Sequence, residues 1–282
     1  MTTLDHDLRS KGVGSSEIAM LVPIPGTGRP MSPWGGPHTL WRRKTGRDDG
    51  PKETAQMSRG HYAEIGLRQW YGDHHGCTPW VPPTTLLEPG IVDSADGLAW
   101  VGGWLVALEC KTVHYSQRKE WGEQGTDQIP AHYLLQCQWH CRVHGAARCD
   151  VPVDFGDSYA LYSVPRNERI MGALRRKALR FWRDHVLADV PPPLDLDDAT
   201  SSWLNTNQDW RGSYREATGE EVALIHAARD NRADAVVVKA GKPLSEVPLK
   251  EAIGELDGLT INGEVAVTYR PDKRGRRSLR LK

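Results

Sequence analysis

The sequence predicts an α/β fold in which helices flank a central mixed β-sheet, followed by a small C-terminal α+β extension. Hydrophobic patterns typical of strands and of helices alternate through roughly the first 190 residues, which favours a sheet covered by helices. A pair of glycines separates two β-prone runs, as expected for a tight hairpin. Three consecutive prolines end this pattern, and the shorter helix and strand signals beyond them predict the extension.

The periodicity of the apolar residues locates the elements of the larger part. It predicts strands over residues 84–92, 98–101, 104–113 and 158–164. It predicts helices over residues 57–71, 130–144 and 168–187. Gly72 closes the first helix, and Pro130 suits the first position of the second, where its missing N–H has no helical role. Gly102 and Gly103 can adopt the positive φ that a two-residue hairpin turn requires.

The clearest domain boundary lies at residues 190–198. The three prolines there stop the preceding helix, and the acidic residues that follow favour an extended linker. We therefore expect one domain over residues 1–193 and an extension over residues 194–282. Helical patterns over residues 216–231 and 249–256 precede a short β-meander in the extension, and its sequence indicates no particular role.

Composition excludes several classes of protein. The chain has 282 residues, 39% hydrophobic and 26% charged, which is unlike a disordered protein. The longest apolar stretch, residues 99–108, contains two glycines and is shorter than the ~18 residues of a membrane span, so we expect no membrane association. The N-terminus lacks the apolar core of a secretory signal, which predicts a cytoplasmic protein with five free cysteines. The net charge is zero, so any nucleic-acid surface must be local.

The glycine turn also predicts which side chains meet across the hairpin. If the strands pair without a bulge, Asp96 lies opposite Glu109 and Ser94 lies opposite Lys111, all on one face. Directly opposed residues have Cβ atoms about 4.5–5.5 Å apart, and like charges there are destabilising. A shared proton, the neighbouring Lys111 or a divalent cation could compensate for this repulsion. The simpler alternative is a salt bridge on an exposed strand between Lys111 and one of the two acids.

Two carboxylates supported by a backbone carbonyl suit Mg²⁺, which usually binds one or two carboxylates and completes its shell with water and phosphate oxygens. The same face of the second strand is apolar at Leu105 and Ala107 before it becomes polar at Glu109. The pattern therefore predicts a site at the end of this strand.

Five sequence motifs, of which the hairpin counts as one, carry a resemblance to a known family. The hairpin provides Ser94-Ala-Asp96-Gly97 and Glu109-Cys110-Lys111. Four further segments occur in the family's order: Arg9-Ser-Lys-Gly-Val-Gly-Ser-Ser16, Leu40-Trp41 through Lys44-Thr45-Gly46, Gly60-His-Tyr-Ala-Glu64, and Ile129-Pro130-x-x-Tyr133-x-x-Gln136-x-Gln138. Together they resemble the YqaJ-like viral recombinases, the branch of the PD-(D/E)XK nucleases that includes phage lambda exonuclease. The resemblance spans roughly residues 9–193, with alanine where the motif has proline before the aspartate.

The resemblance implies a restriction-endonuclease-like core and a role for each motif residue. Asp96, Glu109 and the backbone carbonyl of Cys110 would hold Mg²⁺, for which Mn²⁺ could substitute, and Glu64 would support the same site or a second ion. Lys111 would orient the attacking water, or take its proton if its surroundings lower the lysine pKa. Helical spacing places Tyr133 and Gln136 on one face, from which both can point at the site.

The resemblance also implies a substrate. Exonucleases of this family recognise a terminal 5′-phosphate, and Arg9, Ser16 and Ser94 match the positions that would bind it. The implied activity is Mg²⁺-dependent digestion of double-stranded DNA from phosphorylated ends, 5′ to 3′, in a phage or prophage setting. The implied partners are DNA ends and a single-strand annealing protein, and a ring trimer follows by analogy alone.

Several alternatives remain at this point. An endonuclease on the same fold is one, and a Cas4-like iron–sulfur nuclease is another; the latter would use Cys77, Cys137, Cys141 and Cys149, whose spacing is unlike the usual tight cluster. A zinc site would use His74, His75 and Cys77, although adjacent histidines in a loop are more often solvated. A non-catalytic DNA-end binder is disfavoured, because opposed carboxylates repel phosphate unless a metal intervenes.

Overall fold

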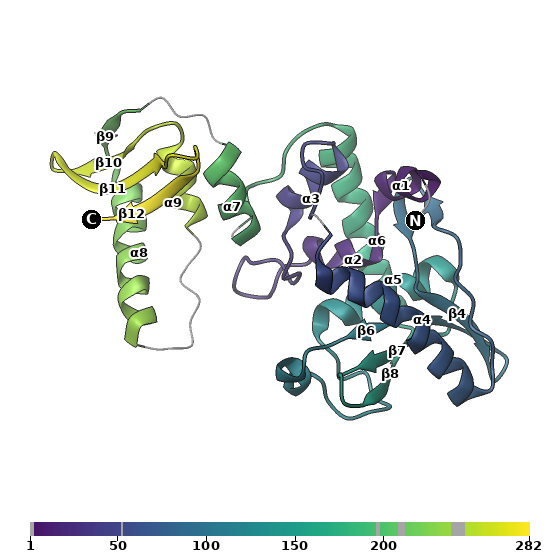
Figure 1. The fold of residues 1–282 in the computed structure, drawn as a ribbon. Helices are drawn as coiled ribbons and strands as arrows, with labels where there is room; N and C mark the ends of the chain where they lie inside the picture. Colours follow the sequence, from purple (N-terminus) through teal and green to yellow (C-terminus); the bar gives the residue numbers. More distant parts are fainter. Residues whose placement is uncertain (1–2, 52, 196–197, 208–211, 238–245) are drawn as a thin grey trace. The chain divides into compact units, whose positions relative to one another are not determined.

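The computed structural model describes residues 3–51, 53–195, 198–207, 212–237 and 246–282 (Figure 1). The chain divides into two compact units. The first contains Met1–Ile24 and Leu40–Pro192, and the second contains Pro25–Thr39 and Pro193–Lys282. Residues 25–39, which the sequence pattern assigned to the first domain, therefore group with the C-terminal part. Asp195 explains this grouping, since its buried carboxylate accepts hydrogen bonds from the backbone N–H groups of Gly36, His38 and Thr39.

A five-stranded mixed sheet forms the centre of the first unit. Its strands are β4 (Gly97–Val101), β5 (Trp104–Leu108), β6 (Lys111–Thr112), β7 (Arg148–Asp154) and β8 (Tyr159–Pro165). The order is β4-β5-β7-β6, and β8 also pairs with β7. Strand β7 runs parallel to β5 and β6 and antiparallel to β8, while β4 and β5 form the antiparallel hairpin. The predicted mixed sheet is thereby confirmed.

A second, three-stranded sheet of the first unit comprises β1 (Gly12–Val13), β2 (Thr85–Glu88) and β3 (Gly90–Asp93), in the order β1-β3-β2. Of four short helices, three lie in the N-terminal third of the chain and one lies in the loop after β6. They are α1 (Thr3–Ser10), α2 (Ser15–Ile18), α3 (Pro37–Lys44) and the 3-10 helix η2 (Tyr115–Glu120). A 3-10 turn, η1 (Ala19–Leu21), follows α2.

The three predicted long helices are present, and their ends follow ordinary capping rules. Helix α4 (Ala55–His75) begins after Thr54, whose side chain accepts from the N–H of Met57, and ends at Gly76 with φ 61°. It is thus one turn longer than the prediction that ended it at Gly72. Helix α5 (Ala131–His144) follows Pro130 and ends at Gly145. Helix α6 (Glu168–Phe181) continues into the π-helical turn η3 (Trp182–Leu187).

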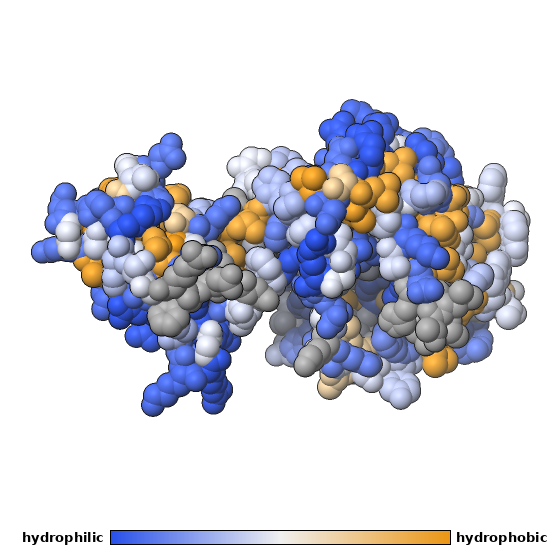
Figure 2. All heavy atoms as spheres, turned by 90° about the horizontal axis from the view of Figure 1, so that it is seen from above, coloured by the Kyte–Doolittle hydropathy of each residue, from blue (hydrophilic) through white to orange (hydrophobic). Residues whose placement is uncertain are grey.

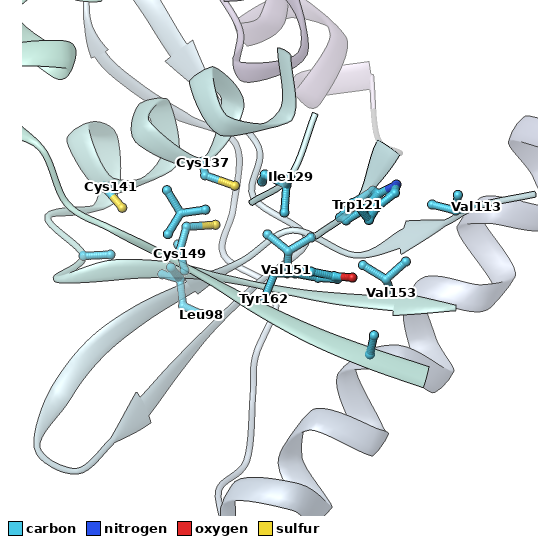
Figure 3. Packing of buried hydrophobic residues seen from close by; sticks show 14 of the residues in the cluster. Leu98, Val113, Trp121, Ile129, Cys137, Cys141, Cys149, Val151, Val153 and Tyr162 are labelled. Carbon is cyan, nitrogen blue, oxygen red and sulfur yellow. The ribbon is translucent and has the colours of Figure 1, made fainter. Parts of the chain in front are cut away.

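The core between the sheet and α5 contains three of the five cysteines. Cys137, Cys141 and Cys149 are fully buried among apolar neighbours such as Val151 (Figure 3). Burial raises the pKa of the Cys141 thiol to about 12, as expected for an inert core residue. Cys77 packs against a different cluster. Within the described residues, neither the four cysteines nor the candidate zinc residues form a group with all ligand atoms within 4.8 Å of one another, so the structure gives no support to either metal site.

The second unit has its own sheet and core. Its helices are α7 (Asp198–Asn207), α8 (Gly219–Val237) and α9 (Val247–Ile253). Strands β9 (Tyr214–Glu216), β10 (Gly258–Ile261), β11 (Glu264–Pro271) and β12 (Arg277–Leu281) form a sheet in the order β12-β11-β10-β9. Ile225, Leu259 and Tyr269 are fully buried in its core. The α+β extension is therefore confirmed.

Among the described helices, none combines the length and apolar character needed to cross a bilayer. On the face drawn in Figure 2, hydrophobic side chains are interspersed with hydrophilic ones on each unit.

Candidate active site

The hairpin follows the register that its glycine turn predicts. Gly102 and Gly103 both have positive φ, and the ladder runs from Val101–Trp104 to Gly97–Leu108. Beyond this pair the backbone ladder ends. The N–H of Cys110 donates to Oδ2 of the Asp96 side chain at 2.7 Å.

The pairing of Ser94 with Lys111, expected from the same register, is not formed. Lys111 pairs with Val153 in β7, while the Ser94 hydroxyl contacts Thr84 Oγ1 at 2.8 Å and accepts from Arg9 Nε at 3.2 Å. The physical reason is that Cys110 donates to the side chain of Asp96 and not to a backbone carbonyl. The segment before β4 therefore no longer pairs with the segment after β5.

Glu109, directly after β5, and Lys111, at the start of β6, lie on one face of the sheet. Strands β5 and β6 both pair with β7, and the difference in number between paired residues is the same for both. The alternation of side chains between the two faces of the sheet therefore continues through Glu109 and Cys110, which separate β5 from β6. The Lys111 ammonium donates to Glu109 Oε1. Glu109 is buried, with 2% of its surface exposed, while the side chain of Lys111 is 18% exposed. The pair therefore lies at the edge of the core, where a substrate can reach the lysine.

The charged form of Asp96 is disfavoured in the site. Burial, the Glu109 carboxylate and, to a smaller degree, Glu64 raise the pKa of Asp96 to about 8, against the lowering effects of Lys111 and the Cys110 N–H. Arg68 Nη1 holds the Asp96 backbone carbonyl at 3.0 Å. The Glu109 carboxylate is thus close enough to Asp96 to disfavour the charged form of Asp96. The Lys111 salt bridge and the tendency of Asp96 to stay protonated both reduce this repulsion.

Lys111 is a cation in this setting. Burial alone would lower its pKa, but the carboxylates of Glu109 and Asp96 outweigh burial and raise the Lys111 pKa above its ordinary value. This shift is opposite in direction to the lowered pKa that would let Lys111 accept a proton. Its Nζ also lies 4.6 Å from the centre of the Tyr133 ring, a cation–π contact. Orientation and charge stabilisation are therefore the roles that suit Lys111.

Helix α5 brings three polar side chains to Glu109 or its salt-bridge partner. Gln136 Nε2 donates to Glu109 Oε1 at 2.8 Å, and His140 Nε2 lies 2.6 Å from Glu109 Oε2. Tyr133 covers the Lys111 ammonium. The spacing at positions i, i+3 and i+7 therefore places all three on the side of α5 that faces the acids, as the helical pattern predicted.

Sequence reasoning missed Asp93 as part of this cluster. His140 Nδ1 lies 2.6 Å from Asp93 Oδ2, and His144 Nε2 lies 3.0 Å from the same oxygen. Among the described residues, these three form the one group whose ligand atoms all lie within 4.8 Å of one another. The separations are hydrogen-bond distances. The signals in the sequence were the i, i+4 spacing of the two histidines and the place of Asp93 directly after a strand.

Glu64 lies on α4 beside the site. Its backbone carbonyl is 3.9 Å from the Cys110 thiol. Burial raises the pKa of Glu64, and the charges of Glu109 and Lys111 act on it in opposite directions. Glu64, Asp96 and Glu109 do not form a group with all ligand atoms within 4.8 Å of one another. Glu64 is therefore an electrostatic neighbour of the two acids in this structure.

The structure joins two of the three predicted phosphate-binding residues. Arg9 is exposed at the end of α1, and its contact with Ser94 connects it to the segment that also carries Asp96. Lys44 Nζ donates to the Arg9 carbonyl at 2.8 Å and forms a salt bridge with Glu17, so the backbone at Arg9 is anchored. Ser16 is exposed on α2.

The donor chemistry of the cluster fits a divalent cation. The Asp96 and Glu109 carboxylates and the neighbouring Cys110 carbonyl are hard oxygen donors of the kind that Mg²⁺ prefers. The raised pKa of Asp96 reports an excess of negative charge that a cation would relieve.

Comparisons with known proteins agree with the fold and the motifs. The YqaJ protein of Bacillus subtilis (strain 168), described as uncharacterized, is 24% identical over 234 residues, which cover 79% of this chain and 67% of that protein. The crystal structure of an alkaline exonuclease, LHK-Exo from Laribacter hongkongensis, matches with a TM-score of 0.54 and 16% identity over 67% of this chain and 94% of that chain. The complex of LHK-Exo with dAMP matches with a TM-score of 0.55 over the same shares.

These likenesses confirm the predicted restriction-endonuclease-like, PD-(D/E)XK type of fold. The family model for the YqaJ-like viral recombinase domain matches residues 6–147, half of the chain, and covers the segment from Arg9 to Ser16, the hairpin motif and the α5 motif. The chain belongs to the YqaJ-like viral recombinase domain family.

Proposed function

We propose that the protein is a Mg²⁺-dependent exonuclease that degrades double-stranded DNA, 5′ to 3′, from phosphorylated ends. The observation that carries this proposal is the convergence of Asp96, Glu109 and Lys111 beside the C-terminal end of β5. Two mutually repelling acids beside a lysine disfavour a purely structural role. Membership of the YqaJ-like family and the likeness in fold to an alkaline exonuclease support the same reading.

Asp96, Glu109 and the Cys110 carbonyl would hold the cation. When bound, a divalent ion lowers the pKa of its water and neutralises charge on the scissile phosphate. Gln136 and His140 keep the Glu109 carboxylate in place from α5. The Lys111 ammonium, steadied by the Tyr133 ring, orients the attacking water and offsets the negative charge that develops on the phosphate.

The assay that tests the proposal compares linear and circular DNA. With Mg²⁺ or Mn²⁺, the protein should release nucleotides from linear duplexes, and excess chelator should stop the release. A covalently closed circle should survive, whereas its digestion would identify an endonuclease. No nucleotide release from linear DNA under any divalent cation would overturn the proposal and favour a DNA-end-binding protein.

The direction of digestion fits a role in recombination. A 5′ to 3′ exonuclease leaves a 3′-ended single strand, which is the substrate of a strand-annealing protein. Labelling one strand at its 5′ end and the other at its 3′ end distinguishes the two polarities, since early release of the 5′ label is expected and early release of the 3′ label would contradict it.

Arg9→Ala should mainly remove the preference for a phosphorylated end. The exposed guanidinium of Arg9, which donates to the Ser94 hydroxyl, can bind a terminal phosphate through charge-assisted hydrogen bonds. We expect the ratio of rates on 5′-phosphate and 5′-hydroxyl ends to fall at least ~10-fold, which corresponds to about 1.4 kcal/mol. Arg118→Ala, at another exposed arginine, is the matched control and should leave the ratio unchanged. An unaltered ratio in Arg9→Ala would remove Arg9 from the phosphate site.

A further inference from the structure

His140 occupies an unusual place for a buried histidine. Its side chain is completely buried and lies between two carboxylates, with Nδ1 2.6 Å from Asp93 Oδ2 and Nε2 2.6 Å from Glu109 Oε2. Asp93 comes from β3, and Glu109 follows β5, so the histidine connects the two sheets of the first unit. The two contacts use both ring nitrogens, and they therefore fix the ring in one orientation.

The helix that carries His140 is itself anchored to β3. The indole Nε1 of Trp139 donates to the carbonyl of Val92 at 3.0 Å, one residue before Asp93. His144, one helical turn after His140, contacts the same Asp93 oxygen at 3.0 Å. The position of the imidazole relative to Asp93 is thus set by backbone and side-chain contacts alike.

The cluster carries a cost that packing alone does not explain. Asp93 Oδ1 is buried and has no hydrogen-bond partner among the described residues, and leaving a buried carboxylate oxygen unpaired destabilises the folded state. Both histidines instead contact Oδ2. An arrangement that leaves one oxygen unsatisfied in order to hold a histidine rigidly is typical of a functional site rather than of a stability element.

The contacts of Glu109 are divided between its two oxygens. Oε2 faces His140, while Oε1 accepts from Lys111 and from Gln136. Oε1 is therefore the oxygen that can bind a metal ion in place of its contact with Lys111, provided that His140 keeps Oε2 fixed.

We infer that His140 is a positioning residue for Glu109: backed by Asp93, it holds Oε2 so that Oε1 is presented to the catalytic cation. This inference rests on the proposed function, because it takes Glu109 as a metal ligand. Metal ligands are commonly oriented by a further shell of hydrogen bonds, and loss of such a partner typically costs about 10- to 100-fold in metal affinity or activity.

Two substitutions at His140 separate its two contacts. In glutamine, Nε2 is as many bonds from Cβ as the histidine Nε2, so His140→Gln keeps a donor for Glu109 and loses the one for Asp93. In asparagine, Nδ2 corresponds to the histidine Nδ1, so His140→Asn keeps the contact with Asp93 and loses the one with Glu109. The two amides carry no charge and are both smaller than imidazole, which makes them matched controls for each other.

The test measures Mn²⁺ binding without DNA, by electron paramagnetic resonance of the free ion, on the full-length protein. His140→Asn should weaken binding about 10- to 100-fold, and His140→Gln should stay within about 3-fold of the parent. In digestion assays, His140→Asn should need more Mn²⁺ for half-maximal rate, while its rate at saturating Mn²⁺ should approach that of the parent. A merely structural histidine would not produce this split.

Each other outcome has a defined meaning. Parent-like Mn²⁺ affinity in His140→Asn would overturn the inference, and so would equal weakening in the two amide variants. If Glu109→Gln binds Mn²⁺ as the parent does, the proposed metal site itself is wrong. This result distinguishes failure of the proposed function from failure of the inference about His140. If His140→Asn does not fold, Asp93→Asn replaces it, with an expected weakening of about 10-fold, and an unchanged Mn²⁺ affinity would contradict the inference.

Discussion

Lys111→Ala is expected to abolish digestion of linear DNA while leaving the fold intact. The ammonium of Lys111 is the cation that contacts Glu109 and lies under the Tyr133 ring, at the edge of the core where it can meet a phosphate. Loss of one positioned group that stabilises developing negative charge costs about 10²–10³ in rate. Nucleotide release from a linear duplex in Mg²⁺ measures the loss, and circular dichroism checks the fold.

Glu109→Gln should have a similar effect on the rate for a different reason. The amide preserves the volume of the side chain but removes one of the two negative charges that would hold the cation. Lys119→Ala, at an exposed lysine of η2, is the control for a general loss of positive charge and should retain parent activity. Parent-level digestion by Lys111→Ala or by Glu109→Gln would defeat the catalytic assignment.

Asp96→Asn should make the metal-free protein more stable and at the same time inactive. The folded-state pKa of Asp96 is about 8, mainly through burial and the Glu109 charge, against 3.8 for an unperturbed aspartate. Because this pKa is raised, ionised Asp96 lowers the stability of the folded state, increasingly as pH rises from about 4 to about 8. Asparagine removes the charge and keeps an oxygen that can accept from the Cys110 N–H.

Thermal melts at several pH values test this expectation. Without metal, Asp96→Asn should melt a few degrees above the parent at pH 8, since about 1 kcal/mol corresponds to about 2–4 °C in a protein of this size. At pH 5 the two should melt at closer temperatures. Added Mg²⁺ should raise the melting temperature of the parent and have little effect on the variant. A variant that melts below the parent at pH 8 would contradict the electrostatic account of the site.

The sequence predicted the hairpin and its register because both depend on local rules. A two-glycine turn needs positive φ, and strand alternation then fixes which residues share a face. The prediction failed beyond Asp96, where the side chain replaces a backbone acceptor for Cys110. A hydrogen bond from a backbone N–H to a side chain does not change the periodicity of a sequence. The loss of the pairing between Ser94 and Lys111 therefore could not be predicted from the sequence.

Helical periodicity likewise placed Tyr133 and Gln136 correctly on the inner face of α5. Asp93 was missed because its link to His140 joins positions 47 residues apart, and periodicity carries no information about contacts between separate elements. The grouping of residues 25–39 with the C-terminal part could not be predicted for the same reason, since the deciding contacts come from the distant Asp195.

A crystal structure of the protein soaked in Mn²⁺ tests the central claim most directly, because the anomalous signal of the ion locates it without reference to activity. The account predicts one strong peak bound by carboxylate oxygens of Asp96 and Glu109 and by the carbonyl of Cys110, with His140 still in contact with Glu109. A peak between Asp93, His140 and His144 instead, with Asp96 and Glu109 left without an ion, would contradict it.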